Sequence, residues 1–351
     1  MITSTSSSQV KTVVSLQKKA KTRKETKQFV VEGMKMVSEV PQDRLVKVYF
    51  SESFAAANVS FLNKFAKEQT ELVSDIVFAQ MSDTKTPQGA LAIVKMAQYT
   101  VQDMMKDKPL LLLVENLQDP GNLGTIVRMA EGAGVTGVIL SPNTVDIYNP
   151  KTIRSTMGSV YRVPFFYAKD FTQQLADLKQ AGVRLYAAHL NGNCEYTQPD
   201  YTGSSAFLIG NEANGLTKAS SDAADVLVRI PMQGQVESFN AAVACTILTF
   251  EAVRQRRTGI GIARIDKGAA IAIFKARRIG RHRVPPRAGR HAQAADLPTL
   301  RNIMQFKGVF QQCAHGGGRS RQIDRQAGAA VNQRQHIAHV VVMQVRQHDG
   351  R

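Results

Sequence analysis

The chain has 351 residues, a net charge of +17 and 43% hydrophobic residues, which is enough apolar material for one or two packed cores. No segment reaches the roughly 18 consecutive apolar residues of a membrane-spanning helix, and the first residues lack the apolar core of a signal peptide. Three cysteines without CxxC spacing, and no zinc-type His/Cys spacing, exclude a disulfide framework and a recognisable metal centre. We therefore expect a cytoplasmic protein that holds no metal.

The positive charge is concentrated near the C-terminus. Residues 1–104 hold 14 Lys and Arg against 10 Asp and Glu, residues 105–257 hold 14 against 14, and residues 258–351 hold 17 against 4. The last segment also has six of the seven His and no Glu. It is either a basic arm that follows nucleic-acid phosphates or translated sequence beyond a lost stop or a shifted frame, and its composition favours the second interpretation.

Residues 1–104 predict a small α/β domain that ends in a polar linker at 98–108. A Ser/Thr-rich start is followed by a helical apolar pattern from Val10 to Leu16. The remaining expected elements are strands at 29–31, 46–50, 76–78 and 91–94 and a helix near 58–67.

A run of basic residues follows the first helical pattern. It contains Lys18, Lys19, Arg23 and Lys24, and Glu25 is the one acid within it. Such a run is typical either of a solvated helix face or of a nucleic-acid contact.

Residues 105–257 alternate between apolar strand patterns and amphipathic helix patterns. Strands are expected at 110–114, 137–140, 184–188, 206–209 and 226–230, and helices at 121–133, 171–181 and 237–254. This alternation predicts a mostly parallel sheet with helices on both faces. The binding crevice should lie at the carboxyl ends of the strands.

The first segment that suggests chemistry is DPGNLGTIVR, where a strand ends and a helix begins. Asn122 stands at the turn and Arg128 lies within the helix, six residues later. Free backbone N–H groups at such a helix start can bind an anion, although a capping Asn and a surface Arg would explain the pattern as well.

Two later segments also follow apolar strands. FLIGNEANGL places Gly210 and Glu212 just beyond the apolar strand that contains Leu208, and its glycines allow the backbone to approach a ligand. By itself this could be an ordinary loop.

The segment IPMQGQVESFN leads into a long amphipathic helix. It places Ser238 in the expected first turn, Asn240 one turn inside, and Val243, Ile247 and Phe250 toward the core. A capped helix would explain Ser238, but not the whole pattern.

Together the three segments resemble the motifs of the SpoU/TrmH-like branch of the SPOUT RNA methyltransferases, over about residues 10–257. The resemblance implies a homodimer with a trefoil-knotted α/β catalytic domain at 105–257. It also implies that residues 1–104 form an RNA substrate-binding domain. The implied reaction is transfer of a methyl group from S-adenosylmethionine (AdoMet) to a ribose 2′-hydroxyl of rRNA or tRNA.

The resemblance also implies roles for particular residues. The residues that would carry catalysis are Asn122, Arg128, Ser238 and Asn240. Those that would bind AdoMet are Leu208, Gly210, Glu212, Ile230, Met232, Ser238 and Phe239. Those that would contact RNA are Lys18, Lys19, Arg23, Lys24, Lys151 and Arg154. Because a guanidinium stays protonated in proteins, we assign Arg128 to positioning of ribose and phosphate, and the proton acceptor stays open.

Two other functions are compatible with parts of the pattern. A dinucleotide-binding oxidoreductase would need GxGxxG after its first strand, which is absent. A non-catalytic RNA-binding protein on the same scaffold would be expected to lack Arg128, Ser238 or Asn240, all of which are present. Binding of AdoMet or of NAD separates these alternatives from the enzyme.

Overall fold

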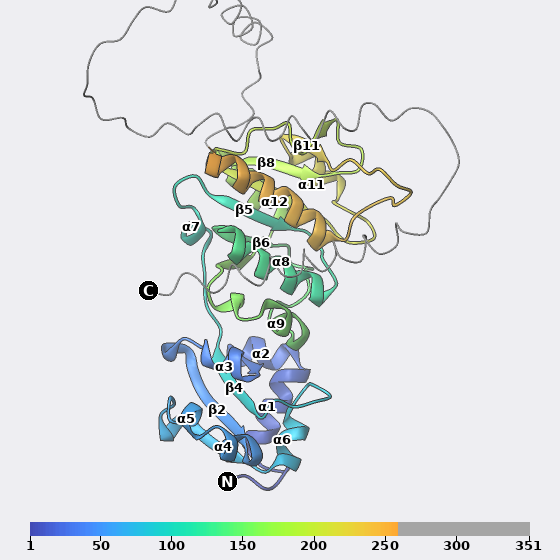
Figure 1. The fold of residues 1–351 in the computed structure, drawn as a ribbon. Coiled ribbons are helices and arrows are strands. Elements are labelled where there is room, and N and C mark those ends of the chain that lie inside the picture. The colour runs from blue at the N-terminus through green and yellow to red at the C-terminus, as the bar shows by residue number, and fades with distance from the viewer. Residues whose placement is uncertain (259–351) are drawn as a thin grey trace, which may run out of the picture. The chain divides into compact units, whose positions relative to one another are not determined.

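The computed structural model describes residues 1–258 (Figure 1). The two interpretations of the basic segment 258–351 concern residues outside the described part, except for Thr258. No helix within it is long and apolar enough to cross a membrane.

The first sheet has four strands in the order β1-β4-β2-β3. These strands are β1 (Gln28–Glu32), β2 (Leu45–Ser51), β3 (Thr70–Val73) and β4 (Ala90–Lys95). Strand β4 runs antiparallel to β1 and β2, and β3 runs parallel to β2. The helices of this region are α1 (Ser8–Lys18), α2 (Ala20–Thr26), α3 (Met34–Ser38), α4 (Glu52–Ala57), α5 (Val59–Leu62) and α6 (Asp75–Met81), with short 3₁₀ turns at Gln42–Arg44 and Lys67–Gln69.

Sequence patterns located three of these four strands, and the strand expected at 76–78 is wrong. Those residues lie in α6, where Val77, Phe78 and Met81 are buried and Ile76 is 78% exposed. That spacing is helical, and the strand of this region is β3, directly before it. The helix expected at 58–67 is the shorter α5.

The polar linker at 98–108 contains a short helix, α7 (Val101–Met104), which the sequence analysis did not predict. Thr100 and Asp103 form a capping box at its start. Met104 is fully buried and touches the apolar cluster of the second sheet. The linker is therefore partly packed and not a free tether.

The second sheet has seven strands in the order β7-β6-β5-β10-β8-β11-β9, and every pairing is parallel. These strands are β5 (Leu110–Val114), β6 (Gly137–Leu140), β7 (Phe165–Tyr167), β8 (Arg184–Ala188), β9 (Cys194–Glu195), β10 (Ser205–Ile209) and β11 (Val226–Arg229). The expected mostly parallel sheet is confirmed. The trefoil knot stays a prediction, since strand order does not trace how the chain threads.

Helices cover both faces of this sheet (Figure 1). They are α8 (Pro120–Ala133), α9 (Pro150–Thr156), α10 (Phe171–Gln180), α11 (Lys218–Ala223) and α12 (Ala241–Thr258), with a 3₁₀ turn at Ser159–Tyr161. Successive residues of the fully buried β5 point to opposite faces of the sheet. Leu112 lies in the apolar cluster with α8 and α12, and Leu113 lies in the cluster with α10. A strand buried on both faces explains the unbroken apolar run LLLLV.

The last helix starts later and faces differently than expected. It begins at Ala241, because the side chain of Asn240 accepts hydrogen bonds from the N–H groups of Ala242 and Val243 and so ends the preceding loop. The inward face is built from Ala241, Ala242, Cys245, Leu248 and Ala252. The inward packing expected for Val243 and Phe250 is wrong, because each is 45% exposed.

Helix α8 packs closely against α9 through Gly124. A Cβ atom at this position would lie 2.4 Å from the Cβ of Ser155 and 2.5 Å from the carbonyl oxygen of Thr152. The close approach fixes α9 against the helix that carries Asn122. On the same helix, a Cβ at Gly132 would meet nothing within 4 Å.

We predict that Gly124→Ala lowers the free energy of unfolding by about 1–3 kcal/mol, because the two helices must separate to admit the methyl group. The matched control Gly132→Ala should raise it by about 0.5–1 kcal/mol, since alanine in an open helical position costs less backbone entropy than glycine. Urea denaturation of both variants measures the difference. Equal stability of the two would contradict the close packing.

Candidate active site

Three segments distant in sequence meet at the carboxyl ends of strands of the parallel sheet. They are the β5–α8 connection, the β10–α11 loop that begins at Gly210, and the segment between β11 and α12. The crevice of a parallel sheet is expected at this edge.

The side chain of Asn122 joins all three segments. Its Nδ2 donates to Glu212 Oε1 over 2.9 Å, and its Oδ1 accepts from Asn240 Nδ2 over 2.8 Å. Asn122 is held in turn by its own backbone N–H, which donates to Asp119, the residue that caps α8. One carboxamide thus connects the three motifs by direct hydrogen bonds.

Glu212 fastens the β10–α11 loop to the start of α8. Besides the bond from Asn122, it accepts hydrogen bonds from the backbone N–H groups of Gln118 and Asp119, at 3.2 and 3.1 Å. Partial burial by itself would raise the pKa of Glu212, but the hydrogen bonds from Asn122 and from these backbone groups hold it below its usual value. Glu212 is therefore an ionised hydrogen-bond acceptor at neutral pH.

A cavity of ≈ 320 Å³ opens beside this network. The candidate cofactor residues that line it are Gly210, Glu212, Ile230, Met232, Ser238 and Phe239. At Gly210 a Cβ atom would lie 2.2 Å from the carbonyl carbon of Gly215, so the loop can fold back on itself only with glycine there. The remaining candidate, Leu208, points elsewhere: its side chain is fully buried in the cluster on the α10 side, and the neighbouring Ile209 lines the cavity.

The cavity has a wall that the sequence analysis missed. His189, Leu190 and Asn191, which follow β8, also line it. The ring nitrogen Nδ1 of His189 accepts a hydrogen bond from the backbone N–H of Asn191. Since β8 adjoins β10 in the sheet, its carboxyl end must lie at the same edge, but no residue pattern in this loop indicates a site.

The catalytic candidates differ in how firmly they are held. Asn122 and Asn240 are bonded to each other, whereas Ser238 is exposed and precedes the helix in whose first turn it was expected to lie. Arg128 is exposed on α8, and no other residue within 1–258 pairs with it or accepts a hydrogen bond from it. Its guanidinium is available to a ligand.

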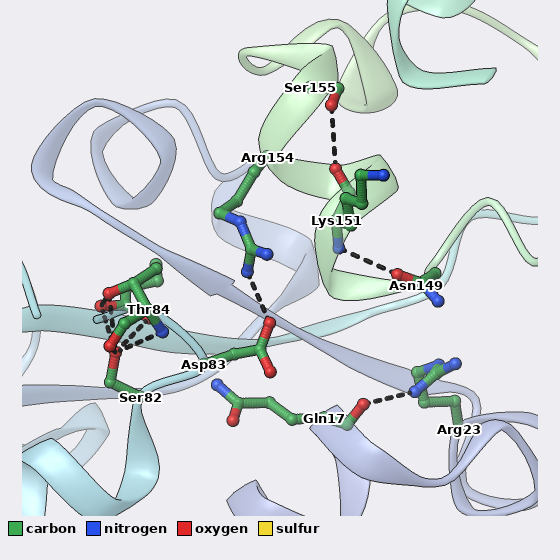
Figure 2. Close-up of polar contacts among 10 residues, drawn as sticks. Gln17, Arg23, Ser82, Asp83, Thr84, Asn149, Lys151, Arg154 and Ser155 are labelled. Carbon is green, nitrogen blue, oxygen red and sulfur yellow. Dashed lines mark hydrogen bonds and ion pairs between the residues drawn. The ribbon is translucent and has the colours of Figure 1, made fainter. Parts of the chain in front are cut away.

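Arg23 is wrongly predicted as an RNA contact. It is 3% exposed and pairs with Asp146 over 2.6 Å, and it also donates to the carbonyl oxygens of Leu16 and Gln17. Figure 2 shows the bond to the backbone of Gln17. A buried cation whose donors are all directed at protein oxygens serves the fold, and removing it would leave the Asp146 carboxylate uncompensated.

The other RNA candidates lie at the surface. Lys18, Lys19 and Lys24 are exposed. Lys151 pairs with Asp119 at 3.1 Å and Arg154 with Asp83 at 2.7 Å, in half-exposed positions (Figure 2 shows the second pair). Exposed pairs of this kind contribute little stability, so a phosphate can replace the carboxylate at small cost.

No group of three or more His, Cys, Asp or Glu side chains within residues 1–258 could hold a metal ion.

Residues 109–250 match the SpoU rRNA Methylase family, and residues 7–92 match the MRM3-like substrate binding domain. The 23S rRNA (guanosine(2553)-2'-O)-methyltransferase RlmP of Bacillus subtilis is 32% identical over 242 residues, which are 66% of this chain and 92% of that protein.

Two solved structures are similar over most of the described residues. The AdoMet-bound rRNA methyltransferase from Sinorhizobium meliloti has a TM-score of 0.65 and 30% identity, covering 72% of this chain and 97% of that one. The SpoU methyltransferase AviRb from Streptomyces viridochromogenes, in complex with the cofactor AdoMet, has a TM-score of 0.63 and 26% identity, covering 72% and 98%.

We predict that Asn122→Asp destabilises the protein in a pH-dependent way. The new carboxylate would face Glu212, and the like charges would raise the pKa of the pair above that of the unfolded chain. The folded state would then bind an extra proton, so the loss of stability should be about 1–2 kcal/mol at pH 8 and shrink as the pH falls toward 5. Thermal melts from pH 5 to pH 8 measure this.

The control is Asn122→Ala, which removes both hydrogen bonds without adding charge. Its loss of stability should depend much less on pH. A pH-independent loss for Asn122→Asp would show that the new carboxylate does not meet Glu212.

Proposed function

The chain belongs to the SpoU rRNA methylase family, and we propose that it methylates a ribose 2′-hydroxyl of 23S rRNA. The family membership predicted from the three motifs is confirmed, as is an AdoMet-dependent RNA 2′-O-methyltransferase activity. The choice of 23S rRNA over tRNA is supported by the names of relatives such as RlmP. In this proposal residues 1–104 bind the substrate, residues 105–257 catalyse the reaction, and the cytoplasm is the compartment.

The cavity beside Glu212 is suited to AdoMet. Ile230, Met232 and Phe239 offer apolar surface to an adenosine and a methionine chain, and the polar groups of Ser238 and Glu212 stand beside them. When bound there, AdoMet supplies a methyl group already activated by its sulfonium charge. The protein then has to align the acceptor hydroxyl with this methyl group and keep other hydroxyl groups away from it.

Four polar residues of the motifs divide this task in our proposal. Ser238 and Asn240 position the acceptor hydroxyl, and Asn122 keeps Asn240 in place through the bond between their carboxamides. Arg128 holds the ribose and its phosphate, since its free guanidinium carries a permanent positive charge. One observation carries the proposal: a single side chain, Asn122, binds the three motifs together next to a cavity of suitable chemistry.

The activity is tested by incubating the full chain with 23S rRNA and methyl-labelled AdoMet. The label should appear on a ribose 2′-oxygen and resist alkaline hydrolysis, and DNA of the same sequence should stay unlabelled because it has no 2′-hydroxyl. Labelling of tRNA alone would overturn the choice of substrate. Binding of RNA without binding of AdoMet and without any label would instead support a non-catalytic RNA-binding protein.

We propose that RNA phosphates lie along α1 and α2. Lys18 and Lys19 line a hollow of ≈ 560 Å³ together with Lys11, Ser15 and Gln80 of α6. Neither Lys18, Lys19 nor Lys24 has a carboxylate partner within the described chain, in contrast to Lys47 of the same region, which pairs with Glu71. Several exposed, unpaired cations on consecutive helices favour a polyanion contact over a merely solvated helix.

Replacing Lys18, Lys19 and Lys24 by Gln should weaken binding of 23S rRNA and flatten its salt dependence. Each lost phosphate contact lowers the slope of log Kobs against log[salt] by about 0.7, so the triple variant should lose about 2. Filter binding between 50 and 300 mM salt measures the slope. The matched control Lys47→Gln should leave it unchanged, and an unchanged slope in the triple variant would remove α1 and α2 from the RNA path.

We also propose a homodimer that uses the outward face of α12. Val243, Ile247 and Phe250 recur at helical spacing on this face and stay exposed or half-exposed, which is typical of a helix that packs against a partner. Phe250→Asp should shift the protein to monomer in sedimentation equilibrium. The control Ile76→Asp, at an equally apolar and more exposed site on α6, should not; dissociation in both would contradict this face.

A further inference from the structure

Glu115 holds both ends of the loop that forms one wall of the cavity. The residue directly follows β5, and its backbone N–H donates to the carbonyl oxygen of Ile209, the last residue before the loop, over 2.8 Å. Its carboxylate accepts from the backbone N–H of Thr217, the first residue after the loop, over 2.9 Å. Glu115 is therefore bonded both to the residue before the loop of residues 210–216 and to the residue after it.

The carboxylate of Glu115 has further partners at the far end of the loop only. Oε1 accepts from the hydroxyl of Thr217 at 2.8 Å and from the hydroxyl of Ser220 at 2.7 Å. The hydroxyl of Thr217 in turn accepts from the backbone N–H of Ser220 and so caps α11. The three residues form a closed set of hydrogen bonds between the end of β5 and the start of α11.

Because Glu115 is buried, its carboxylate needs hydrogen-bond donors from the protein itself. Glu115 is 5% exposed, and no Lys, Arg or His within residues 1–258 forms an ion pair with it. A buried carboxylate without a counter-ion is tolerated only where hydrogen-bond donors replace water, and all donors to this one come from Thr217 and Ser220. Any displacement of the end of the loop therefore leaves the carboxylate unsatisfied.

Glu115 does not line the cavity, whereas every residue from Gly210 to Leu216 does. The middle of the loop has its own attachment, the bonds of Glu212 to Asn122 and the backbone. Gly215 is held by two backbone hydrogen bonds with Asn211, close to Gly210. The bonds around Glu115 hold the chain where it leaves the loop, directly after Leu216.

We propose that Glu115 is a positioning residue for the cofactor: by holding Thr217 it gives the loop of residues 210–216 the shape that binds AdoMet. This inference rests on the proposed function of the cavity. It assigns Glu115 no contact with AdoMet or RNA. Its role depends on accepting hydrogen bonds and not on negative charge, because none of its partners is a cation.

The test compares Glu115→Ala with Glu115→Gln in the full chain. Alanine removes all three acceptor bonds, and the dissociation constant of AdoMet measured by calorimetry should rise at least tenfold. Glutamine can still accept from the N–H of Thr217, and its NH₂ can donate to the two hydroxyls, which can rotate to accept. It should therefore restore AdoMet binding to within about threefold of the parent.

Kinetics separates positioning from general damage. With 23S rRNA and labelled AdoMet, Glu115→Ala should raise the KM for AdoMet while kcat and the KM for RNA stay within about twofold. The control is Glu251→Ala, which removes another mostly buried carboxylate, held by Arg254 and Gln255 on α12, and should leave the KM for AdoMet unchanged. If Glu115→Ala does not fold, Thr217→Val combined with Ser220→Ala carries the same expectation.

The outcomes distinguish this inference from the proposed function. A parent protein that fails to bind AdoMet would contradict the function of the cavity itself. A parent that binds, together with a Glu115→Ala variant that binds equally well, would overturn the role of Glu115. So would an equal rise in KM for Glu251→Ala, or a failure of glutamine to restore binding.

Discussion

The site depends on the carboxamide of Asn122, which donates to Glu212 and accepts from Asn240. An amide is suited to this position because it offers one donor and one acceptor group in a fixed plane, whereas a carboxylate would repel Glu212 and a hydroxyl would be too short to reach both partners. Glu212 remains ionised because Asn122 and two backbone N–H groups donate to it. The three motifs therefore form one hydrogen-bonded unit.

Two residues outside the cavity support this unit. Gly124 allows α9 to lie directly against α8, and Glu115 closes the loop that carries Glu212. Neither residue touches the cavity. Both act by placing the backbone: Gly124 has no side chain to keep α9 away, and the buried carboxylate of Glu115 accepts hydrogen bonds from Thr217 and Ser220. A mutational survey limited to residues that line the cavity would miss them.

The fold distinguishes between basic residues that look alike in the sequence, because some are buried and others are exposed. Arg23 lies between Lys19 and Lys24 in the basic run, yet it is buried against Asp146, more than a hundred residues away. Its neighbours turn outward because helix geometry places them on another face. The composition of the run predicts affinity for anions. Only the position of Asp146 shows that Arg23 is the basic residue that cannot take part in such a contact.

The sequence by itself determined the main strands of the parallel sheet, the family and most residues around the cavity, because strand and helix periodicity and the glycine-containing motifs of the loops are local properties. Tertiary structure decided the helical state of residues 76–78, the burial of Arg23, the direction of Leu208 and the outward face of α12. Each of these depends on which distant surface a residue meets. Periodicity shows that a segment has an apolar side, but the partner that covers that side is supplied by the rest of the fold.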